Sequence, residues 1–272
     1  MKLGCRAHDY GRHTPGDLAA LLAGRGYNAC QLAPVKGLLG VESYRQLTLD
    51  DASAIGKAFQ DAGVEISVLG CYMDLSSPDS ATRRAAVENV IHCLNLQNAM
   101  GARCVGSESS YEHLDAEEKA RRFPLLEDSV LRITEAAARC GGVFAIEPVF
   151  WYPLDSIQRT QALLERVADP QHLALILDPA NVLKRRDQPR QGEIWTAWLE
   201  AFGPRIRAMH IKDFVLEGDT YCPRGLGQGV MDYTAIHSWL VRCRPDLPLL
   251  REEVQLSRDA ADLDFMRRLA EP

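Results

Sequence analysis

The sequence predicts an α/β fold in which parallel strands and helices alternate to form a single-domain (β/α)8 TIM barrel. Three observations favour this fold. Apolar strand-like stretches and helical stretches alternate eight times along the chain. The length of 272 residues suits a barrel, which takes about 250 residues as one domain. Four of the strands end in a side chain that can bind a metal, and no linker or low-complexity tract divides residues 1–272.

The first half of the chain contains four of the predicted units. Strands are expected at residues 2–7, 28–33, 64–72 and 102–105, with the fourth leading into GSESS. Helices are expected from Thr14 to about residue 25, then at 49–62, 77–100 and 115–139. Thr14 suits an N-cap and Pro15 the first helical position, Ser77-Pro78 should start the third helix, and Gly141-Gly142 should close the fourth.

The second half contains the strands with metal-capable ends. The stretches are VFAIEP at 143–148, LALILD at 173–178, RAMHIKD at 207–213 and LPLLREEV at 247–254, with helices at 156–167, 195–202, 232–242 and 257–269. The almost wholly apolar run at 173–177 is typical of a strand buried on both faces of a parallel sheet, and it ends at Asp178. An open doubly wound sheet is the rival fold, but it would not readily gather ligands from four successive strands.

Glu147, Asp178, His210 and Glu252 are the predicted metal ligands. They follow one another at intervals of 31, 32 and 42 residues, each enough for a strand, a helix and two loops. The same end of four successive barrel strands therefore carries all four, which predicts one site at the C-terminal mouth. One imidazole and three carboxylates favour Mn²⁺ or Mg²⁺, with Co²⁺ or Zn²⁺ as alternatives.

Each of these residues alone has a simpler interpretation. Glu147 could be an ion-pair partner at a strand end, Asp178 the cap of a turn, and His210 a core histidine. Glu253 competes with Glu252, but alternation along the strand would turn Glu253 away from the barrel interior if Glu252 faces it. Four such residues at equivalent strand ends make a joint site the better explanation.

Composition limits the remaining classes of function. The net charge of −6, with only Lys184-Arg185-Arg186 as a basic run, argues against a nucleic-acid partner. There is no apolar run of 18 residues and no signal-peptide pattern at the N-terminus, so a cytoplasmic protein without a membrane partner is expected. The eight cysteines form no CxxC pair and are expected to be buried free thiols.

The motifs FAIEP, LILDPAN, MHIKD and LLREEV resemble the four metal-ligand motifs of the xylose isomerase-like barrel superfamily. They are most similar to those of the sugar-phosphate isomerase/epimerase family, which includes D-tagatose and D-psicose 3-epimerases and hydroxypyruvate isomerases. The resemblance spans most of the chain and is strongest after Gly142. It implies that Glu147, Asp178, His210 and Glu252 bind the metal, and that Glu147 and Glu252 also act as the catalytic acid/base pair.

The sequence departs from these relatives at one position and from another branch at several. The sugar 3-epimerases carry a substrate-binding His three residues after the strand-six Asp, where this chain has Asn181. An Asn can hydrogen-bond a hydroxyl but cannot carry a proton, so this departure affects substrate binding more than metal binding. The DNA-repair endonuclease branch needs further His ligands; Cys71, Tyr72 and Asn181 stand near their places, and His113 is too isolated to replace them.

Loops at the same end of the strands supply candidate substrate-binding residues. We predict this role for a set of polar or aromatic side chains: His8, Asn181, Lys212, Asp213, Arg224 and Trp151. Asp213 could instead orient an imidazole, and Glu108 could support the site from the end of the fourth strand. Gly225, Gly227 and Gly229 do not open a helix directly after a strand, so a dinucleotide loop is rejected in favour of a flexible lid.

The predicted reaction is metal-dependent isomerisation or epimerisation by proton transfer next to the carbonyl of a small sugar or polyol. An unphosphorylated substrate is favoured, because no Gly-rich strand-to-helix turn or compact basic cluster marks a phosphate site. Two alternatives stay open: a dehydratase (lyase) of a keto-polyol such as an inosose, and a non-catalytic sugar-binding barrel. Assembly into a homo-oligomer is also left open.

Overall fold

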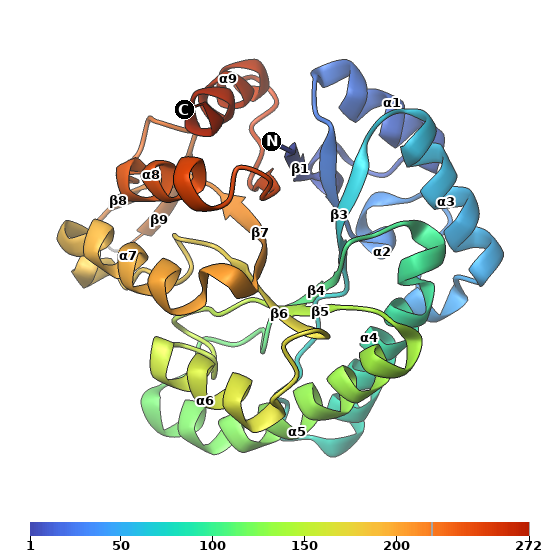
Figure 1. Cartoon of the computed structure of the whole chain (residues 1–272), viewed down its shortest axis with the longest axis horizontal. Coiled ribbons are helices and arrows are strands. Elements are labelled where there is room, and N and C mark those ends of the chain that lie inside the picture. The colour runs from blue at the N-terminus through green and yellow to red at the C-terminus, as the bar shows by residue number, and fades with distance from the viewer. Residues whose placement is uncertain (219, 272) are drawn as a thin grey trace.

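In the computed structural model, which describes residues 1–218 and 220–271, eight parallel strands close into a barrel surrounded by helices (Figure 1). Their order around the barrel is β1-β10-β7-β6-β5-β4-β3-β2, so the first strand pairs with the last. The strands are β1 Leu3–Arg6, β2 Ala29–Leu32, β3 Glu65–Gly70, β4 Val105–Ser107, β5 Phe144–Ile146, β6 Leu173–Leu177, β7 Ile206–Ile211 and β10 Leu249–Arg251. This closed ring confirms the predicted (β/α)8 barrel and excludes the open doubly wound sheet.

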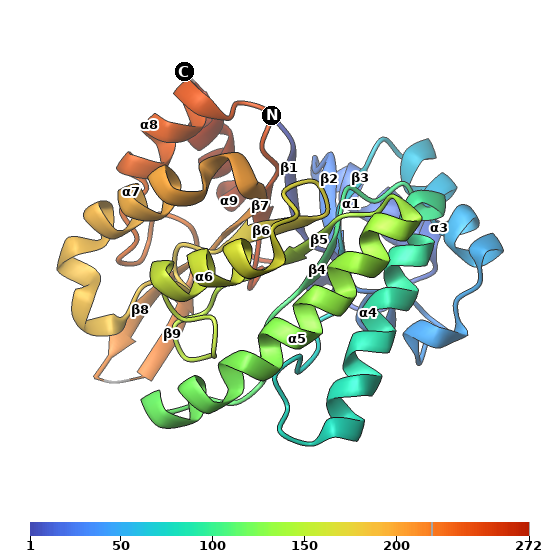
Figure 2. The same cartoon turned by 60° about the horizontal axis from the view of Figure 1, so that its bottom comes forward.

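The helices cover the outside of the barrel (Figures 1 and 2). They are α1 Pro15–Arg25, α2 Pro34–Gly37, α3 Leu49–Asp61, α4 Ser80–Met100, α5 Ala116–Cys140, α6 Ile157–Val167, α7 Gln191–Phe202, α8 Thr234–Cys243 and α9 Asp259–Ala270, with short 3-10 turns η1 Ala7–Tyr10, η2 Tyr44–Gln46, η3 Arg185–Arg190 and η4 Gly203–Arg205. Two of the predicted caps are confirmed: Thr14 accepts from the Asp17 backbone N–H at 3.2 Å, and Gly141 ends α5 in the left-handed conformation.

Three predicted element bounds were wrong. The fourth strand lies at Val105–Ser107 instead of 102–105, because the Arg103 N–H and the Cys104 C=O pair with β3 alone, whereas Val105 begins the pairing with β5. Helix α4 is capped by Asp79, whose carboxylate accepts from the Thr82 backbone N–H at 2.7 Å, and not by Ser77. Helix α7 begins at Gln191, four residues before the predicted start.

The segment after β7 forms an antiparallel hairpin that the sequence analysis missed. Its strands are β8 Asp213–Glu217 and β9 Thr220–Arg224, with Asp213 opposite Arg224. Figure 2 shows the hairpin at the end of the molecule where α4 and α5 begin, which is the C-terminal mouth of the barrel. The glycine-rich stretch that follows is held by carboxylates: Gly229 N–H donates to Asp213 and Leu226 N–H to Asp262.

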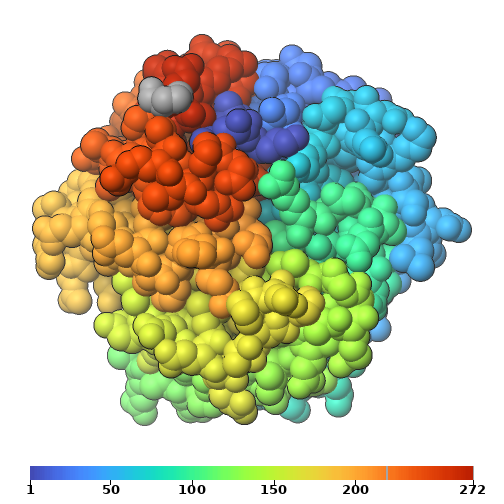
Figure 3. Space-filling view, viewed as in Figure 1, coloured from blue at the N-terminus to red at the C-terminus, as the bar shows by residue number. Residues whose placement is uncertain are grey.

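The opposite end of the barrel is closed by side chains. Figure 3 shows the face on which the chain begins, without a hollow at its centre, and the cavity described below therefore opens at the other end. All eight cysteines are free; five are buried as expected, whereas Cys140 and Cys222 are half-buried and Cys243 is exposed. Within the described residues, no helix is both long and apolar enough to cross a membrane.

Candidate metal centre and cavity

A layer of polar side chains lies inside the barrel at the C-terminal ends of the strands. Every second side chain of a barrel strand faces the interior, and small or aliphatic residues form the layer below. That lower layer consists of Ala29, Val68, Cys104, Ala145, Ala174, Ile176, Ala208 and Leu250. Two positions further along five of these strands stand Gln31, Glu147, Asp178, His210 and Glu252, all buried. The strand pleat therefore gathers these five side chains into one layer.

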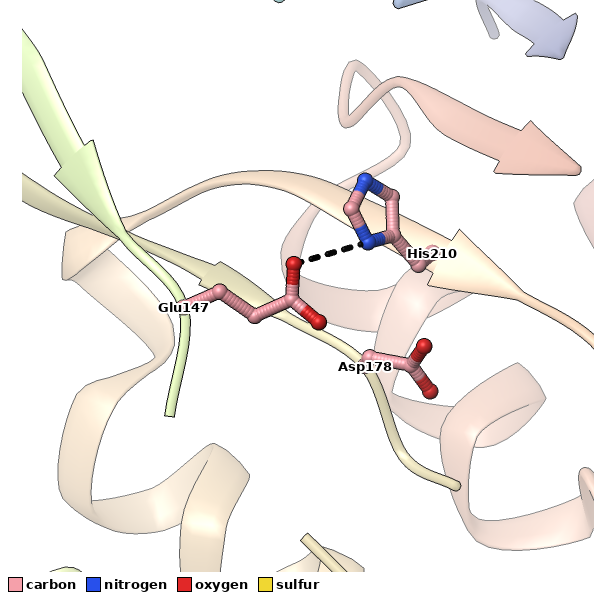
Figure 4. Close-up of side chains that lie close together, drawn as sticks. All are labelled: Glu147, Asp178 and His210. Carbon is pink, nitrogen blue, oxygen red and sulfur yellow. Dashed lines mark ion pairs between the residues drawn. The ribbon is translucent and has the colours of Figure 1, made fainter. Parts of the chain in front are cut away.

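Glu147, Asp178 and His210 form the centre of this layer. Each presents one potential ligand atom, and these atoms lie within 4.8 Å of one another. Figure 4 shows Glu147 and His210 facing each other, with Asp178 beside them; the three side chains come from the ends of the adjacent strands β5, β6 and β7. The His210 Nδ1 atom lies 3.2 Å from Glu147 Oε2, and both residues are at most 1% exposed. The trio could hold a metal ion.

Gln31 sets the orientation of the His210 ring. His210 Nε2 donates to Gln31 Oε1 at 2.6 Å, and the Tyr72 hydroxyl donates to the same oxygen at 3.0 Å. Because an amide oxygen can only accept, Nε2 carries a proton and Nδ1 faces the carboxylates. Nδ1 finds no hydrogen-bond partner among the described residues. Burial disfavours the charged ring, but Glu252 and Glu147 outweigh burial and raise the pKa of His210 to about 9.

Glu252, directly after β10, lies beside this centre but is not among the three residues whose ligand atoms all lie within 4.8 Å of one another, and its neighbour Glu253 points elsewhere. Glu252 Oε1 lies 3.5 Å from His210 Nδ1, and its Oε2 lies 3.4 Å from Lys212 Nζ. Although burial opposes ionisation, His210 and Lys212 lower the pKa of Glu252 well below its usual range. Glu253 has a positive φ of 54° and accepts from the Tyr221 hydroxyl of the hairpin at 2.7 Å. The alternation that favoured Glu252 thus agrees with the geometry.

Asp178 both caps a turn and faces the centre. Its Oδ1 accepts from the backbone N–H groups of Ala180 at 2.8 Å and Asn181 at 3.2 Å. Its Oδ2 lies 2.9 Å from Lys212 Nζ, so Lys212 stands between Asp178 and Glu252. Asn181 donates from Nδ2 to Glu147 Oε1 at 2.7 Å, which leaves Glu147 Oε2 for the centre. The simple interpretation of Asp178 as a cap therefore holds for one of its two oxygens.

The donor set fits a divalent cation. Three buried carboxylates converge here, whereas one ammonium, that of Lys212, lies within 3.5 Å of them. Carboxylates taken out of water need opposite charge nearby. Nδ1 of His210 points at Glu147 and Glu252, while its other nitrogen is tied to Gln31, as is usual for a metal-binding imidazole. A cation at Nδ1 would replace the proton there and balance the carboxylates.

A family comparison agrees with this geometry. The family model described as xylose isomerase-like TIM barrel matches residues 19–249. The chain belongs to this family. No curated protein sequence matches it at a significant level.

Solved structures share the fold of this xylose isomerase-like barrel at low sequence identity. D-psicose 3-epimerase of Clostridium cellulolyticum H10, crystallised with D-tagatose, has a TM-score of 0.76 and 17% identity, with 100% of both chains covered. The probable 3-DHS dehydratase of Bacillus anthracis has a TM-score of 0.73 and 14% identity over 98% of this chain and 99% of that one. A xylose isomerase-like protein of Mycobacterium smegmatis, in complex with magnesium, has a TM-score of 0.73 and 14% identity. The match covers 99% of this chain and 96% of that one.

In this xylose isomerase-like barrel, a cavity of about 960 Å³ opens above the metal centre. Four of the predicted substrate-binding residues line it: His8, Trp151, Asn181 and Lys212. The Trp151 ring stacks on His113, with centroids 5.0 Å apart, and both rings form part of the wall. Burial and the charge of Arg6 lower the pKa of His8 to about 4, so its ring is neutral at pH 7.

The structure does not bring Asp213 or Arg224 to the cavity. Asp213 accepts from the backbone N–H groups of Phe214, Gly229 and Met231, and so holds the segment after the hairpin in place. Arg224 points along the hairpin and forms an ion pair with Glu217 at 2.7 Å. Their sequence positions after His210 suggested the site, but the hairpin turns both side chains away from it.

Sequence reasoning missed Gln31, Arg6 and Tyr72. Arg6 Nη1 lies 3.7 Å from Glu252 Oε1, and Tyr72 and Gln31 form the hydrogen-bond chain that ends on His210. The signal was present, since Arg6 and Gln31 are polar residues at the ends of otherwise apolar strands. Glu108, expected only as support, lines the cavity at the end of β4. Burial, together with Glu147 and Glu252, raises its pKa to about 8.

Proposed function

We propose that the protein is a divalent-metal-dependent isomerase or epimerase that moves a proton next to the carbonyl of a small sugar or related hydroxy-carbonyl compound. Mn²⁺ or Mg²⁺ is the proposed metal, bound by Glu147, Asp178, His210 and Glu252. Its oxygen-rich donor set and the magnesium complex of a related barrel support this choice. The D-tagatose complex of another related barrel supports a sugar-like substrate.

The observation that carries this proposal is the approach of two glutamates to one atom from different strands. Glu147 Oε2 and Glu252 Oε1 lie 3.2 and 3.5 Å from His210 Nδ1, and the cavity lies above them. A hydroxy-ketone bound over this point would have one carboxylate on each side of the carbon next to its carbonyl. Such a pair can remove a proton from one face and return one to the other.

The chain's own residues prepare both carboxylates for this task. A divalent ion held at the centre would polarise the substrate oxygens and stabilise developing negative charge. Asn181 binds Glu147 Oε1, whereas His210, Lys212 and Arg6 hold Glu252 ionised. Trp151 and His113 form a flat aromatic wall against which a sugar carbon face can pack. The buried position of the centre excludes most water from the reacting carbon.

Glu108 favours a dehydratase as the second candidate. With a pKa of about 8, this carboxyl is largely protonated at neutral pH and lines the cavity. A protonated carboxyl can donate its proton to a departing hydroxide, which then leaves as water while a glutamate removes the neighbouring proton. The similar fold of the probable 3-DHS dehydratase of Bacillus anthracis supports this second candidate.

Proton exchange with solvent distinguishes the candidates. Protein loaded with Mn²⁺ is incubated with D-tagatose, D-fructose and a keto-acid series in deuterated water, and deuterium next to the carbonyl is measured by NMR. We expect incorporation by the unaltered protein and a loss of about 10²–10⁴-fold in Glu147→Gln and Glu252→Gln. A new double bond or diketone would indicate the dehydratase, and binding without turnover a sugar-binding barrel.

Glu253→Gln is the matched control, because Glu253 contacts Tyr221 instead of the metal centre. It should retain exchange and metal content. Metal analysis after dialysis and saturation with Mn²⁺ separates a loss of metal from a loss of proton transfer. A product formed without deuterium in the unaltered protein would contradict the two-glutamate mechanism.

A further inference from the structure

Positive side chains surround the cavity of this acidic protein. The chain has a net charge of −6, yet the cavity lining contains seven Lys or Arg residues and three Glu residues. The positive charge comes from segments far apart in the sequence, which only the barrel brings together. The carboxylates of Glu147, Asp178 and Glu252 lie below this positively charged lining.

Three of the seven form ion pairs with carboxylates of the barrel, and a fourth lining cation, Arg185, also has an interaction partner. Arg6 contacts Asp9 and Glu252, Lys212 contacts Asp178 and Glu252, and Lys119 contacts Asp155. They therefore balance carboxylates of the protein and do not provide charge for a ligand.

The cations at the mouth are different. Among the described residues, no ion pair involves Lys36 or Lys184, and Arg186 lies 3.9 Å from the carboxylate of its half-buried neighbour Asp187. Lys36 follows β2 and is exposed, whereas Lys184 and Arg186 follow β6. Strands β2 and β6 are opposite each other in the ring, so these charges face the mouth from two sides. Fields from like charges around a low-dielectric cavity add up within it.

We propose that the substrate carries an anionic group, a carboxylate or a phosphate, that binds at the cavity mouth to Lys184 and Arg186 with Lys36 opposite. This rests on the proposed function of the same cavity, because the hydroxy-carbonyl end is taken to lie at the metal centre. Arg presents a planar fork of N–H donors to such oxygens, and Lys adds a mobile point charge. The anionic group balances the positive charge at the mouth. It also orients the hydroxy-carbonyl end of the substrate toward Glu147 and Glu252.

Binding measurements test this subsite without requiring turnover. Protein loaded with Mn²⁺ is titrated calorimetrically with D-fructose, D-fructose 6-phosphate and 5-keto-D-gluconate, at low and at high salt. We expect one or both anions to bind about tenfold more tightly than D-fructose, with the difference shrinking at high salt. Preference for the phosphate or for the carboxylate identifies the group.

The Lys184→Ala/Arg186→Ala double variant should lose about tenfold in affinity for the preferred anion and bind D-fructose unchanged. Lys57→Ala/Arg166→Ala is the matched control, since it removes the same charge from exposed positions on α3 and α6 outside the cavity lining. The subsite is overturned if neither anion binds more tightly than D-fructose, or if the first double variant weakens all three ligands equally. Selective anion binding without deuterium exchange would keep the subsite and reject the proposed reaction.

Discussion

His210 depends on a residue 179 positions away in the sequence, Gln31, for its orientation. The side-chain amide of Gln31 is 2% exposed and accepts from both His210 and Tyr72. If the ring turned Nε2 toward the carboxylates, its buried hydrogen bond to Gln31 Oε1 would be lost. Gln31 is therefore a positioning residue for His210 in the candidate metal centre.

Replacing Gln31 by Leu should weaken Mn²⁺ binding about 10–100-fold, because a partner that fixes the metal-binding imidazole is lost. Affinity is measured by competition with a coloured chelator, and circular dichroism checks that the variant is folded. Gln31→Glu keeps an acceptor at the same place and should retain affinity. Gln161→Leu, at an exposed position of α6, is the control. An unchanged affinity in Gln31→Leu would argue against His210 as a ligand through Nδ1.

At the scale of elements, the pleat of each barrel strand determines what reaches the site. On β4 the alternate positions are Cys104, Gly106 and Glu108, and a Cβ placed on Gly106 would lie 2.6 Å from Val68 Cγ1 and 2.8 Å from Ile176 Cδ1. Glycine at this position lets the side chains of β3 and β6 meet inside the barrel. It also leaves room below Glu108 and below the Tyr72 hydroxyl. The oxygen of that hydroxyl lies 3.6 Å from the Cβ position placed on Gly106.

Gly106→Ala should lower the free energy of unfolding by about 1–3 kcal/mol, because the added methyl group overpacks the barrel interior. Thermal or urea denaturation, monitored by circular dichroism, measures this change in the free energy of unfolding. Gly24→Ala is the control: it lies in α1, nothing approaches within 4 Å of its Cβ position, and stability there should rise by up to about 1 kcal/mol. If Gly106→Ala is as stable as the parent, the interior is looser than the packing indicates.

At the scale of the whole molecule, the two ends of the chain close the barrel together. Strand β1 pairs with β10, and α9 packs near them. Asp259, at the start of α9, accepts at 2.6 Å from the hydroxyls of both Tyr10 and Tyr27. This buried contact joins the first βα unit to the last helix.

Asp259→Ala should destabilise the protein by about 1–3 kcal/mol, since two buried hydroxyls lose their acceptor. Denaturation should show the loss, whereas Mn²⁺ affinity of the folded variant should be unchanged. The exposed ion pair of Asp264 with Arg267 provides the comparison, and Asp264→Ala should change stability by no more than about 1 kcal/mol. Equal stability of the two variants would show that the tyrosines find other partners.

The sequence by itself determined the barrel and the four proposed ligands. Apolar runs alternating with helical stretches require a parallel sheet, and the carboxyl ends of its strands necessarily meet at one mouth. Side-chain alternation then places Glu147, Asp178, His210 and Glu252 on the inner face and turns Glu253 away. These patterns are local, so they can be recognised in the sequence without knowing where distant segments lie.

Only the tertiary structure decided which side chains meet across the barrel. Gln31 reaches His210 across the interior, Lys212 stands between Asp178 and Glu252, and the hairpin carries Arg224 away from the cavity. The hairpin itself was missed although DFVLE and TYCPR flank Gly218, whose φ is positive. The gathering of Lys36 with Lys184 and Arg186 at one mouth likewise depends on closure of the ring, which no local pattern encodes.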